Sequence, residues 1–146
     1  MVAHDFIVRT NWQGGRNVSG QLNGDILNET ISIPAALGGI GEGTNPDELL
    51  VSAASGCYII SLAAVLERAN FTDIQITQTS TGTAVFEQGK FKMTQIKHEA
   101  RISVAPHQKH DLERKIQKLS GVADRNCMIS NAVRNNVDIV ILPTIV

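Results

Sequence analysis

The sequence predicts an α+β fold in which antiparallel sheets pack around a central buried helix. Two observations lead to this prediction. Short runs of strand-forming residues on both sides of residues 48–69 are joined by turn signals, which indicates antiparallel hairpins. Residues 48–69 are rich in Leu, Ala, Ile and Val and carry scarcely any charge before Glu67, so they should form a helix buried on nearly every side. No repeat or linker divides the chain, and we expect one domain over residues 1–146.

Three short strands are expected at the N-terminus, at residues 3–12, 19–24 and 28–33. Asn23-Gly24 separates the last two and is a strong hairpin signal, because both residues tolerate a left-handed backbone. The sheet should therefore begin as an antiparallel one.

The central helix should begin at Pro46, after a glycine-rich loop over residues 38–44. Asn45 is a residue type that caps helices, and proline suits the first helical position. Glu48 stands three residues after the cap, as in a capping box.

A long hairpin is expected from residues 73–87 and 91–104, which are rich in Thr, Ile and Val around Gln88-Gly89-Lys90. A surface helix should follow over residues 107–123, because apolar residues recur there at helical spacing with charges between them. These apolar positions are Leu112, Ile116 and Leu119. A short helix over residues 127–134 and a strand over residues 137–142 complete the prediction.

The composition is that of an ordinary globular chain, with 42% hydrophobic and 18% charged residues among 146. The formal net charge is −1 and the charges are interspersed, so no basic stripe exists that would favour nucleic acid or an anionic membrane as a partner. The first ten residues lack a basic and then apolar leader, and no 18 consecutive residues are apolar. We expect a cytoplasmic protein.

Cys57 and Cys127 are the only cysteines. In a reducing compartment, a bond between them would be transient and catalytic or sensory, since permanent disulfides are rare there. Cys127 stands where the short helix begins, and helix N-terminal N–H groups stabilise a thiolate. For each cysteine the alternative is a small buried hydrophobic residue with no chemical role.

Other reactive groups are less specific. Arg16 follows Gly14-Gly15, so a tight turn could aim its guanidinium inward, although an exposed turn arginine is commoner. Glu48 already has a structural role as a cap. Only His107 and His110, three residues apart, have a spacing that a zinc site could use, but they stand where a loop meets a helix and should be solvated. No metal or cofactor is expected. The glycine run also lacks the Gly-Lys-Ser/Thr end of a phosphate loop.

Four separated elements resemble the OsmC/Ohr family of hydroperoxide reductases, and its Ohr-like branch most closely. They are Gly14-Gly15-Arg16, the run from Leu37 to Leu49 with its Gly-Thr-Asn-Pro-Asp-Glu-Leu end, the run from Ser52 to Cys57, and Cys127. The resemblance covers essentially the whole chain. It implies an OsmC-like fold, an intertwined homodimer, and two sites at the subunit interface, each built from Arg16, Glu48, Cys57 and Cys127.

The resemblance also implies a reaction. The Cys57 thiolate, stabilised by Arg16, would reduce an organic hydroperoxide and become a sulfenic acid, which Cys127 would convert to a disulfide. The reductant would be a dithiol, and the family suggests a lipoyl-bearing protein. Apolar residues near the cysteines should form the substrate pocket. The candidates are Leu37, Ile40, Tyr58, Met128 and Ile129.

Two features depart from the family pattern. Gly56-Cys57-Tyr58 replaces the Ala-Cys-Phe typical of the hydroperoxide-resistance branch, and Asn17 replaces an acidic residue. Glu48 and Cys57 also stand nine residues apart, on opposite faces of a straight helix and about 13 Å apart along its axis. We therefore predict either a helix break near Ser55-Gly56 or a Glu48 supplied by the partner subunit.

Two other functions remain open. The protein could be a non-catalytic binder of a small hydrophobic ligand, or a thiol-based oxidant sensor, and either would be oxidised without turnover. A thiol-disulfide oxidoreductase acting on proteins ranks last, because such enzymes favour the Cys-x-x-Cys motif, which is absent.

Overall fold

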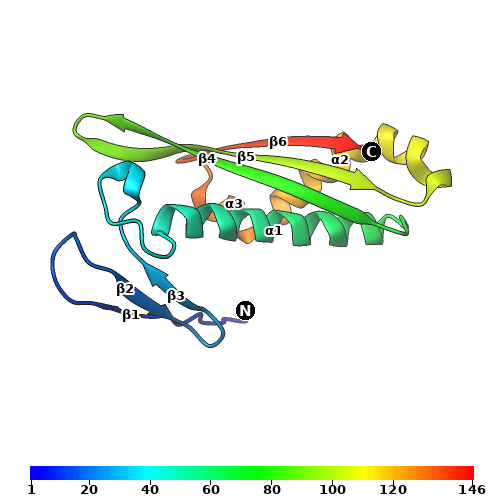
Figure 1. Ribbon diagram of the computed structural model, residues 1–146. Helices are drawn as coiled ribbons and strands as arrows, with labels where there is room; N and C mark the ends of the chain where they lie inside the picture. The colour runs from blue at the N-terminus through cyan, green and yellow to red at the C-terminus, as the bar shows by residue number, and fades with distance from the viewer. The chain divides into compact units, whose positions relative to one another are not determined.

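The computed structural model describes all 146 residues and contains two compact units, Met1–Leu49 and Leu50–Val146 (Figure 1). The N-terminal unit is a three-stranded sheet with strand order β1-β2-β3, in which both pairs are antiparallel. The strands are β1 (Arg9–Trp12), β2 (Gly20–Asn23) and β3 (Asn28–Ile31). The three predicted strands are confirmed, although each has only four residues.

Asn23 and Gly24 mark the turn between β2 and β3, as predicted. Asn23 pairs with Asn28, and the Gly24 N–H donates to the Leu27 carbonyl at 2.8 Å. The connection is therefore a four-residue loop over residues 24–27, and Asn23-Gly24 stands at its start.

The glycine-rich loop is shaped by close backbone contacts. After the short helix η1 (Ala35–Leu37), Gly43 adopts a positive φ of 67°, and a Cβ there would lie 2.1 Å from the Thr30 carbonyl oxygen. A Cβ on Gly39 would lie equally close to the Ile33 carbonyl oxygen. Only glycine allows the loop to run so close to β3 and to the residues that follow it. This steric requirement explains the glycine run, and no phosphate ligand is needed to explain it.

The central helix α1 (Pro46–Arg68) begins at the predicted residue. The Asn45 side-chain oxygen accepts the Glu48 N–H at 2.9 Å, which confirms the cap. The helix is continuous over its 23 residues, so the predicted break near Ser55-Gly56 is wrong. Gly56 has a low helix propensity but removes no backbone hydrogen bond. The helix-forming residues on both sides of it are enough to keep α1 helical at this position.

Burial of α1 is less complete than its composition predicts. Five residues are buried, namely Ala54, Tyr58, Leu62, Val65 and Leu66, whereas Ile60 is 70% exposed. The expectation of a helix buried on nearly every side is thus wrong for the single chain. With a mean hydropathy of 2.1 over 18 residues, α1 is long and apolar enough to cross a membrane by length and composition alone. The core helix of a soluble protein meets the same criteria.

The C-terminal unit contains a three-stranded sheet of order β4-β5-β6. The predicted hairpin is confirmed: β4 (Gln75–Glu87) and β5 (Lys90–Ser103) are antiparallel. Gln88 and Gly89, with φ of 53° and 78°, form the two-residue turn between them. The strand β6 (Asp138–Ile145) instead pairs parallel to β5, because the chain crosses over through two helices.

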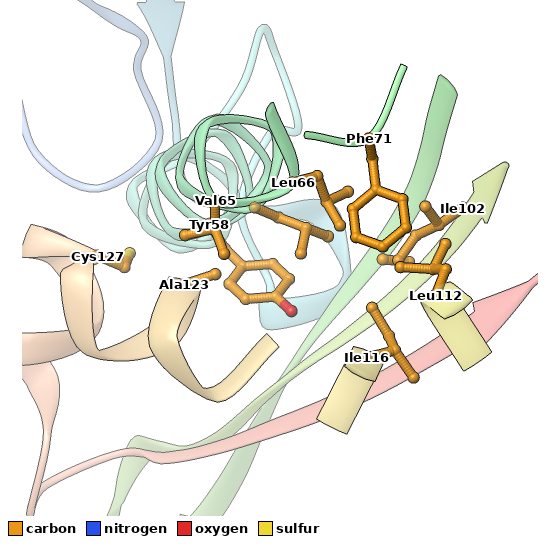
Figure 2. Packing of buried hydrophobic residues seen from close by; sticks show 11 residues of the cluster. Tyr58, Val65, Leu66, Phe71, Ile102, Leu112, Ile116, Ala123 and Cys127 are labelled. Atoms are coloured by element: carbon orange, nitrogen blue, oxygen red, sulfur yellow. The ribbon is translucent and has the colours of Figure 1, made fainter. Parts of the chain in front are cut away.

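Those helices are α2 (Lys109–Asn126), which follows η2 (Pro106–Gln108), and α3 (Met128–Val133). The inward residues of β5 alternate with exposed Glu99 and Arg101, so one face of the sheet packs on the helices. Figure 2 shows the resulting core between α1, β5 and α2. Its buried members include Tyr58, Leu62, Leu66, Phe71, Ala100, Ile102, Leu112, Ile116 and Cys127, with Leu119 packed against them.

Candidate active site

The fold brings Cys57 and Cys127 together. Cys57 lies on α1 and is partly buried, whereas Cys127 caps α3 and is fully buried in the core cluster against which Cys57 packs. Both are free thiols, and Cys57 is among the groups that raise the pKa of Cys127. Cys57 on α1 and Cys127 between α2 and α3 are thus the candidate pair for exchange between dithiol and disulfide.

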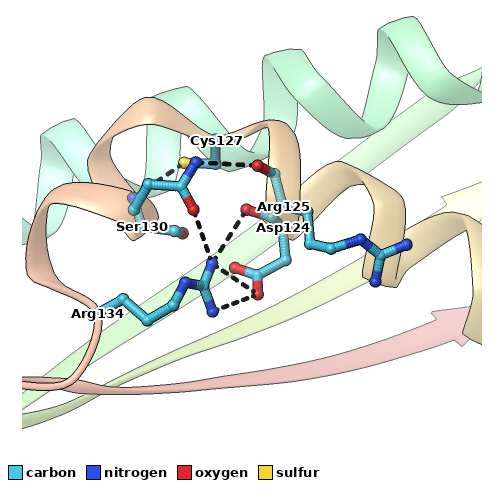
Figure 3. Close-up of polar contacts among 6 residues, drawn as sticks. Asp124, Arg125, Cys127, Ser130 and Arg134 are labelled. Atoms are coloured by element: carbon cyan, nitrogen blue, oxygen red, sulfur yellow. Dashed lines mark hydrogen bonds and ion pairs between the residues drawn. The ribbon is translucent and has the colours of Figure 1, made fainter.

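The surroundings of Cys127 favour the protonated thiol. Burial raises the pKa of Cys127, and hydrogen bonding to Cys57 raises it further. Ser130 acts in the opposite direction: its backbone N–H donates to Cys127 Sγ at 3.4 Å (Figure 3). The predicted stabilisation of a Cys127 thiolate by the helix start is therefore present but outweighed by burial.

Accessibility separates the roles of the two cysteines. A peroxide must reach the sulfur that attacks it, and Cys127 is 0% exposed. Cys57 retains partial exposure on α1. Of the two thiols, only Cys57 is partly exposed to solvent and also packs against a core that contains a second thiol.

Arg16 and Glu48 lie in the N-terminal unit and do not pair with each other there. Arg16 is in the exposed turn between β1 and β2, with its guanidinium near Gly38. The Glu48 carboxylate accepts the Thr44 hydroxyl at 2.8 Å. In a complete capping box this carboxylate would accept a hydrogen bond from the Asn45 N–H. Here the Thr44 hydroxyl is the donor in place of that N–H, so only one of the two hydrogen bonds of the box is present.

The unbroken helix argues against one of the two predicted positions of Glu48. On a continuous α1, Glu48 and Cys57 point to opposite faces and are separated by about 13 Å along the axis. A break that would turn Cys57 toward the Glu48 of its own chain is absent. The other alternative, a Glu48 supplied by the partner subunit, stays a prediction.

The predicted pocket residues have different surroundings. In the N-terminal unit, Leu37 lines a cavity of about 250 Å³, and Ile40 is 40% exposed. In the C-terminal unit, Met128 is 64% exposed, and Ile129 is half-buried and packs against the core. Tyr58 is fully buried, and its ring stacks on His98. The structure thus places Tyr58 in the core and away from any surface that a substrate reaches.

Sequence reasoning missed a partly buried polar network between α1, β4 and β5. The Gln78 amide donates to Ser55 Oγ at 2.9 Å and to Ser80 Oγ at 3.3 Å. Ser80 Oγ also lies 2.8 Å from Ser55 Oγ and 2.7 Å from His98 Nδ1. His98 is 0% exposed and occupies an inward position of β5, so the alternation of that strand was the signal that could have found it.

Asp124 and Arg134 form a second polar feature, at the junction of α2 and α3 (Figure 3). Both terminal nitrogens of Arg134 donate to Asp124 Oδ2, at 3.2 and 3.3 Å, and Nη2 also donates to Asn131 Oδ1 at 3.1 Å. The Cys127 N–H donates to the Asp124 carbonyl at 3.2 Å. This pair therefore fixes the backbone on both sides of Cys127.

Comparison with known proteins finds relatives that align with most of this chain. The chain is 37% identical to the uncharacterized protein YmaD of Bacillus subtilis over 95% of this chain and 93% of that protein. It is 30% identical to an organic hydroperoxide resistance protein of Xanthomonas axonopodis pv. citri, over 86% of this chain and 85% of that protein.

Solved structures share the fold. An OsmC-like protein of unknown function from Vibrio cholerae superposes with a TM-score of 0.80 at 16% identity, over 97% of this chain and 99% of that one. The organic hydroperoxide resistance protein OhrB of Bacillus subtilis superposes with a TM-score of 0.68 at 25% identity, over 96% and 98%. The predicted OsmC-like α+β fold is therefore confirmed. Residues 39–141 match the family model for OsmC-like proteins, and the chain belongs to the OsmC-like family.

Proposed function

We propose that the protein is a thiol-dependent peroxidase of the Ohr-like branch that reduces organic hydroperoxides to alcohols. The observation that carries this proposal is that Cys57, a partly exposed free thiol, packs against the core cluster that contains Cys127, a fully buried free thiol. The relatives named as organic hydroperoxide resistance proteins, at 30% identity over most of the chain, support the same chemistry.

The proposed reaction has two steps within the protein. The Cys57 thiolate attacks the terminal oxygen of the hydroperoxide, the O–O bond breaks, and the alkoxide takes a proton and leaves as the alcohol. Cys57 is then a sulfenic acid. Cys127 attacks the Cys57 sulfur, the S–O bond breaks, and water leaves as the disulfide forms. An external dithiol returns the disulfide to two thiols.

Activation of Cys57 is assigned to Arg16 and Glu48 in a homodimer. A guanidinium beside the sulfur would favour the thiolate and the negative charge that develops on oxygen. Because α1 is unbroken, we assign the carboxylate that orients this arginine to Glu48 of the partner subunit. Ala53 and Ile60 on α1 are exposed and apolar, which supports a second copy against this helix.

An organic substrate is favoured over hydrogen peroxide by the apolar residues available to it. Leu37, Ile40 and Met128 are all exposed large hydrophobic residues, and an apolar wall binds an alkyl chain but gains nothing from hydrogen peroxide. The family resemblance further leads us to propose a lipoyl-bearing protein as the reductant and the cytoplasm as the compartment.

The test is turnover of cumene hydroperoxide and of hydrogen peroxide with a dithiol reductant. Cys57→Ser should abolish turnover, and Cys127→Ser should leave one round of sulfenic acid formation that dimedone traps. Ser52→Ala is the control, because Ser52 is exposed on the same helix. Equal rates for both peroxides would contradict the assigned substrate class.

The second candidate function is a binder of a small hydrophobic ligand. It is favoured by the cavity of about 250 Å³ in the N-terminal unit, which is lined mainly by apolar residues. They are Trp12, Ile31, Ile33, Pro34, Leu37 and Pro46, with Ser32 and Asp47. One round of thiol oxidation in the wild type without turnover would favour this candidate.

A further inference from the structure

The cavity of about 250 Å³ in the N-terminal unit has one wall whose position is fixed by the protein itself. That wall is the indole ring of Trp12, the only tryptophan of the chain. The indole Nε1 donates to the Gly15 carbonyl at 2.9 Å. Trp12 also pairs with Gly20 across β1 and β2, and a Cβ on Gly20 would lie 2.5 Å from the Trp12 ring. The hydrogen bond and the absence of a side chain at Gly20 therefore hold the ring against the strand.

The polar residues of the cavity lining leave little for a charged ligand to bind. The Ser32 hydroxyl donates to the Glu42 carbonyl at 2.7 Å, so its proton is already used. Asp47, in the first turn of α1, is exposed and is the only charged residue of the lining. An apolar cavity whose single charge is a carboxylate fits an uncharged organic group and disfavours an anion.

The two groups that the proposed function assigns to activation of the thiolate stand beside residues of the cavity wall. A Cβ on Gly38 would lie 3.7 Å from Arg16 Nη2, and Gly38 directly follows Leu37 of the wall. Glu48 directly follows Asp47, another residue of the wall. Neighbouring Cα atoms are only about 3.8 Å apart. The N-terminal unit thus combines an apolar cavity with a guanidinium and a carboxylate, which suits a substrate with an organic group and a peroxide group.

The volume of the cavity limits how much of an organic group it can hold. A cavity of about 150 Å³ binds benzene, so a volume of 250 Å³ corresponds to about ten carbon atoms. The organic group of cumene hydroperoxide is close to this size. A longer chain must leave its remaining methylenes in water, where they add nothing to binding.

We propose that this cavity binds the organic group of the hydroperoxide, and that its size matches the enzyme to compact, uncharged groups of up to about ten carbon atoms. Trp12 and Leu37 are specificity-determining residues in this proposal, and neither takes part in the chemistry. The inference rests on the proposed function for the identity of the substrate. Binding of a compact organic group in the cavity does not depend on that function.

The first experiment measures binding through the fluorescence of Trp12, because no other tryptophan contributes to the signal. The probes are 2-phenylpropan-2-ol and straight-chain primary alcohols of increasing length, which carry a hydroxyl in place of the hydroperoxide and do not oxidise thiols. Each methylene that enters the cavity should tighten binding about fourfold, and this gain should stop at about ten carbon atoms. No saturable change with any alcohol, or a gain that continues beyond that length, would overturn the inference.

Leu37→Ala tests the size limit by enlarging the cavity. Leu37 is 36% exposed, so the fold should tolerate this change. The variant removes three carbon atoms from the wall and should move the limit toward longer alcohols by about three methylenes. Leu27→Ala is the matched control, because Leu27 is 38% exposed in the same unit and does not line the cavity. It should keep the wild-type limit. A limit that is the same in Leu37→Ala and in the wild type would contradict the assigned cavity.

Turnover separates this inference from the proposed function. The kcat/KM for primary alkyl hydroperoxides should rise with chain length, stop rising at the length found for the alcohols, and follow the new limit in Leu37→Ala. If alcohols bind but kcat/KM does not change with chain length, the cavity does not hold the substrate, and the proposed function still stands. Saturable binding of alcohols without turnover of any hydroperoxide would instead overturn the proposed function and favour the ligand binder.

Discussion

The ring of Tyr58 lies parallel to the imidazole of His98, with centroids 5.1 Å apart and planes within 5°. Both rings are fully buried. Burial lowers the pKa of His98, and the nearby Asp124 carboxylate only partly opposes this shift. A neutral imidazole against the face of a tyrosine is thus the form that the folded protein selects.

The free energy of unfolding should therefore depend on the protonation of His98. The unfolded chain binds a proton on this histidine below its ordinary pKa of about 6.5, whereas the folded chain does not. The contribution of His98 to stability should be constant above that pH. It should fall as the pH drops from about 6.5 toward the lower pKa of His98 in the folded chain. Urea denaturation between pH 7.5 and 5 measures this change in the free energy of unfolding.

His98→Gln should be less stable at pH 7.5, because the hydrogen-bond partner of Ser80 changes. It should also lose the part of the pH dependence of stability that comes from protonation of His98. His110→Gln is the matched control, since the His110 side chain is 86% exposed. Identical pH slopes for the wild type and His98→Gln would contradict the burial argument.

The high pKa of Cys127 makes a prediction for a chain that retains only this cysteine. In Cys57→Ser, burial still acts on Cys127 and is the largest cause of the shift. The thiolate absorbance should therefore appear only above the ordinary thiol pKa of about 8.5. Alkylation of Cys127 by iodoacetamide should be slow at pH 8 and become fast in urea, where the free thiol is exposed. Fast alkylation of the folded variant at pH 8 would contradict this prediction.

Local signals in the sequence predicted the ends of elements well. Asn45 and Pro46 start α1, Gln88-Gly89 turns the long hairpin, and Cys127 caps α3, each through hydrogen bonds or dihedral angles set by neighbouring residues. The four candidate catalytic residues came from their order along the chain and the family resemblance. The packing of Cys57 against the core cluster that contains Cys127 could not be predicted from that order.

Features set by packing between distant segments could not be predicted in this way. The parallel pairing of β6 with β5 depends on how α2 and α3 cross the sheet, and His98 looked like one polar residue in a strand. The pairing of Asp124 with Arg134 at the junction of α2 and α3 likewise had no signal in the sequence. The break near Ser55-Gly56 was one of two alternatives, offered to bring Glu48 and Cys57 to one site; α1 is continuous because one glycine costs little beside the rest of a long apolar helix.

A homodimer that covers α1 predicts a strong effect at Ile60. This side chain is 70% exposed in the single chain, and glutamate there should leave the fold intact. In the dimer a buried carboxylate without a partner would cost about 3 kcal/mol, or about a hundredfold in the dissociation constant. Sedimentation should show monomers for Ile60→Glu and dimers for the control Ile26→Glu, where Ile26 is 98% exposed in a turn. A wild-type chain that sediments as a monomer would contradict the proposed dimer.

The two glycines Gly43 and Gly56 should respond to alanine in opposite ways. Gly43 has a φ of 67°, and a Cβ there would lie 2.1 Å from the Thr30 carbonyl oxygen, so Gly43→Ala should destabilise by more than about 1 kcal/mol. A Cβ on Gly56 meets nothing within 4 Å, and alanine is the better helix former by about 1 kcal/mol. Gly56→Ala should therefore stabilise α1 in thermal denaturation and preserve turnover. A loss of stability in Gly56→Ala would mean that the partner subunit contacts the helix closely at this position, where the chain departs from the Ala-Cys-Phe of the hydroperoxide-resistance branch.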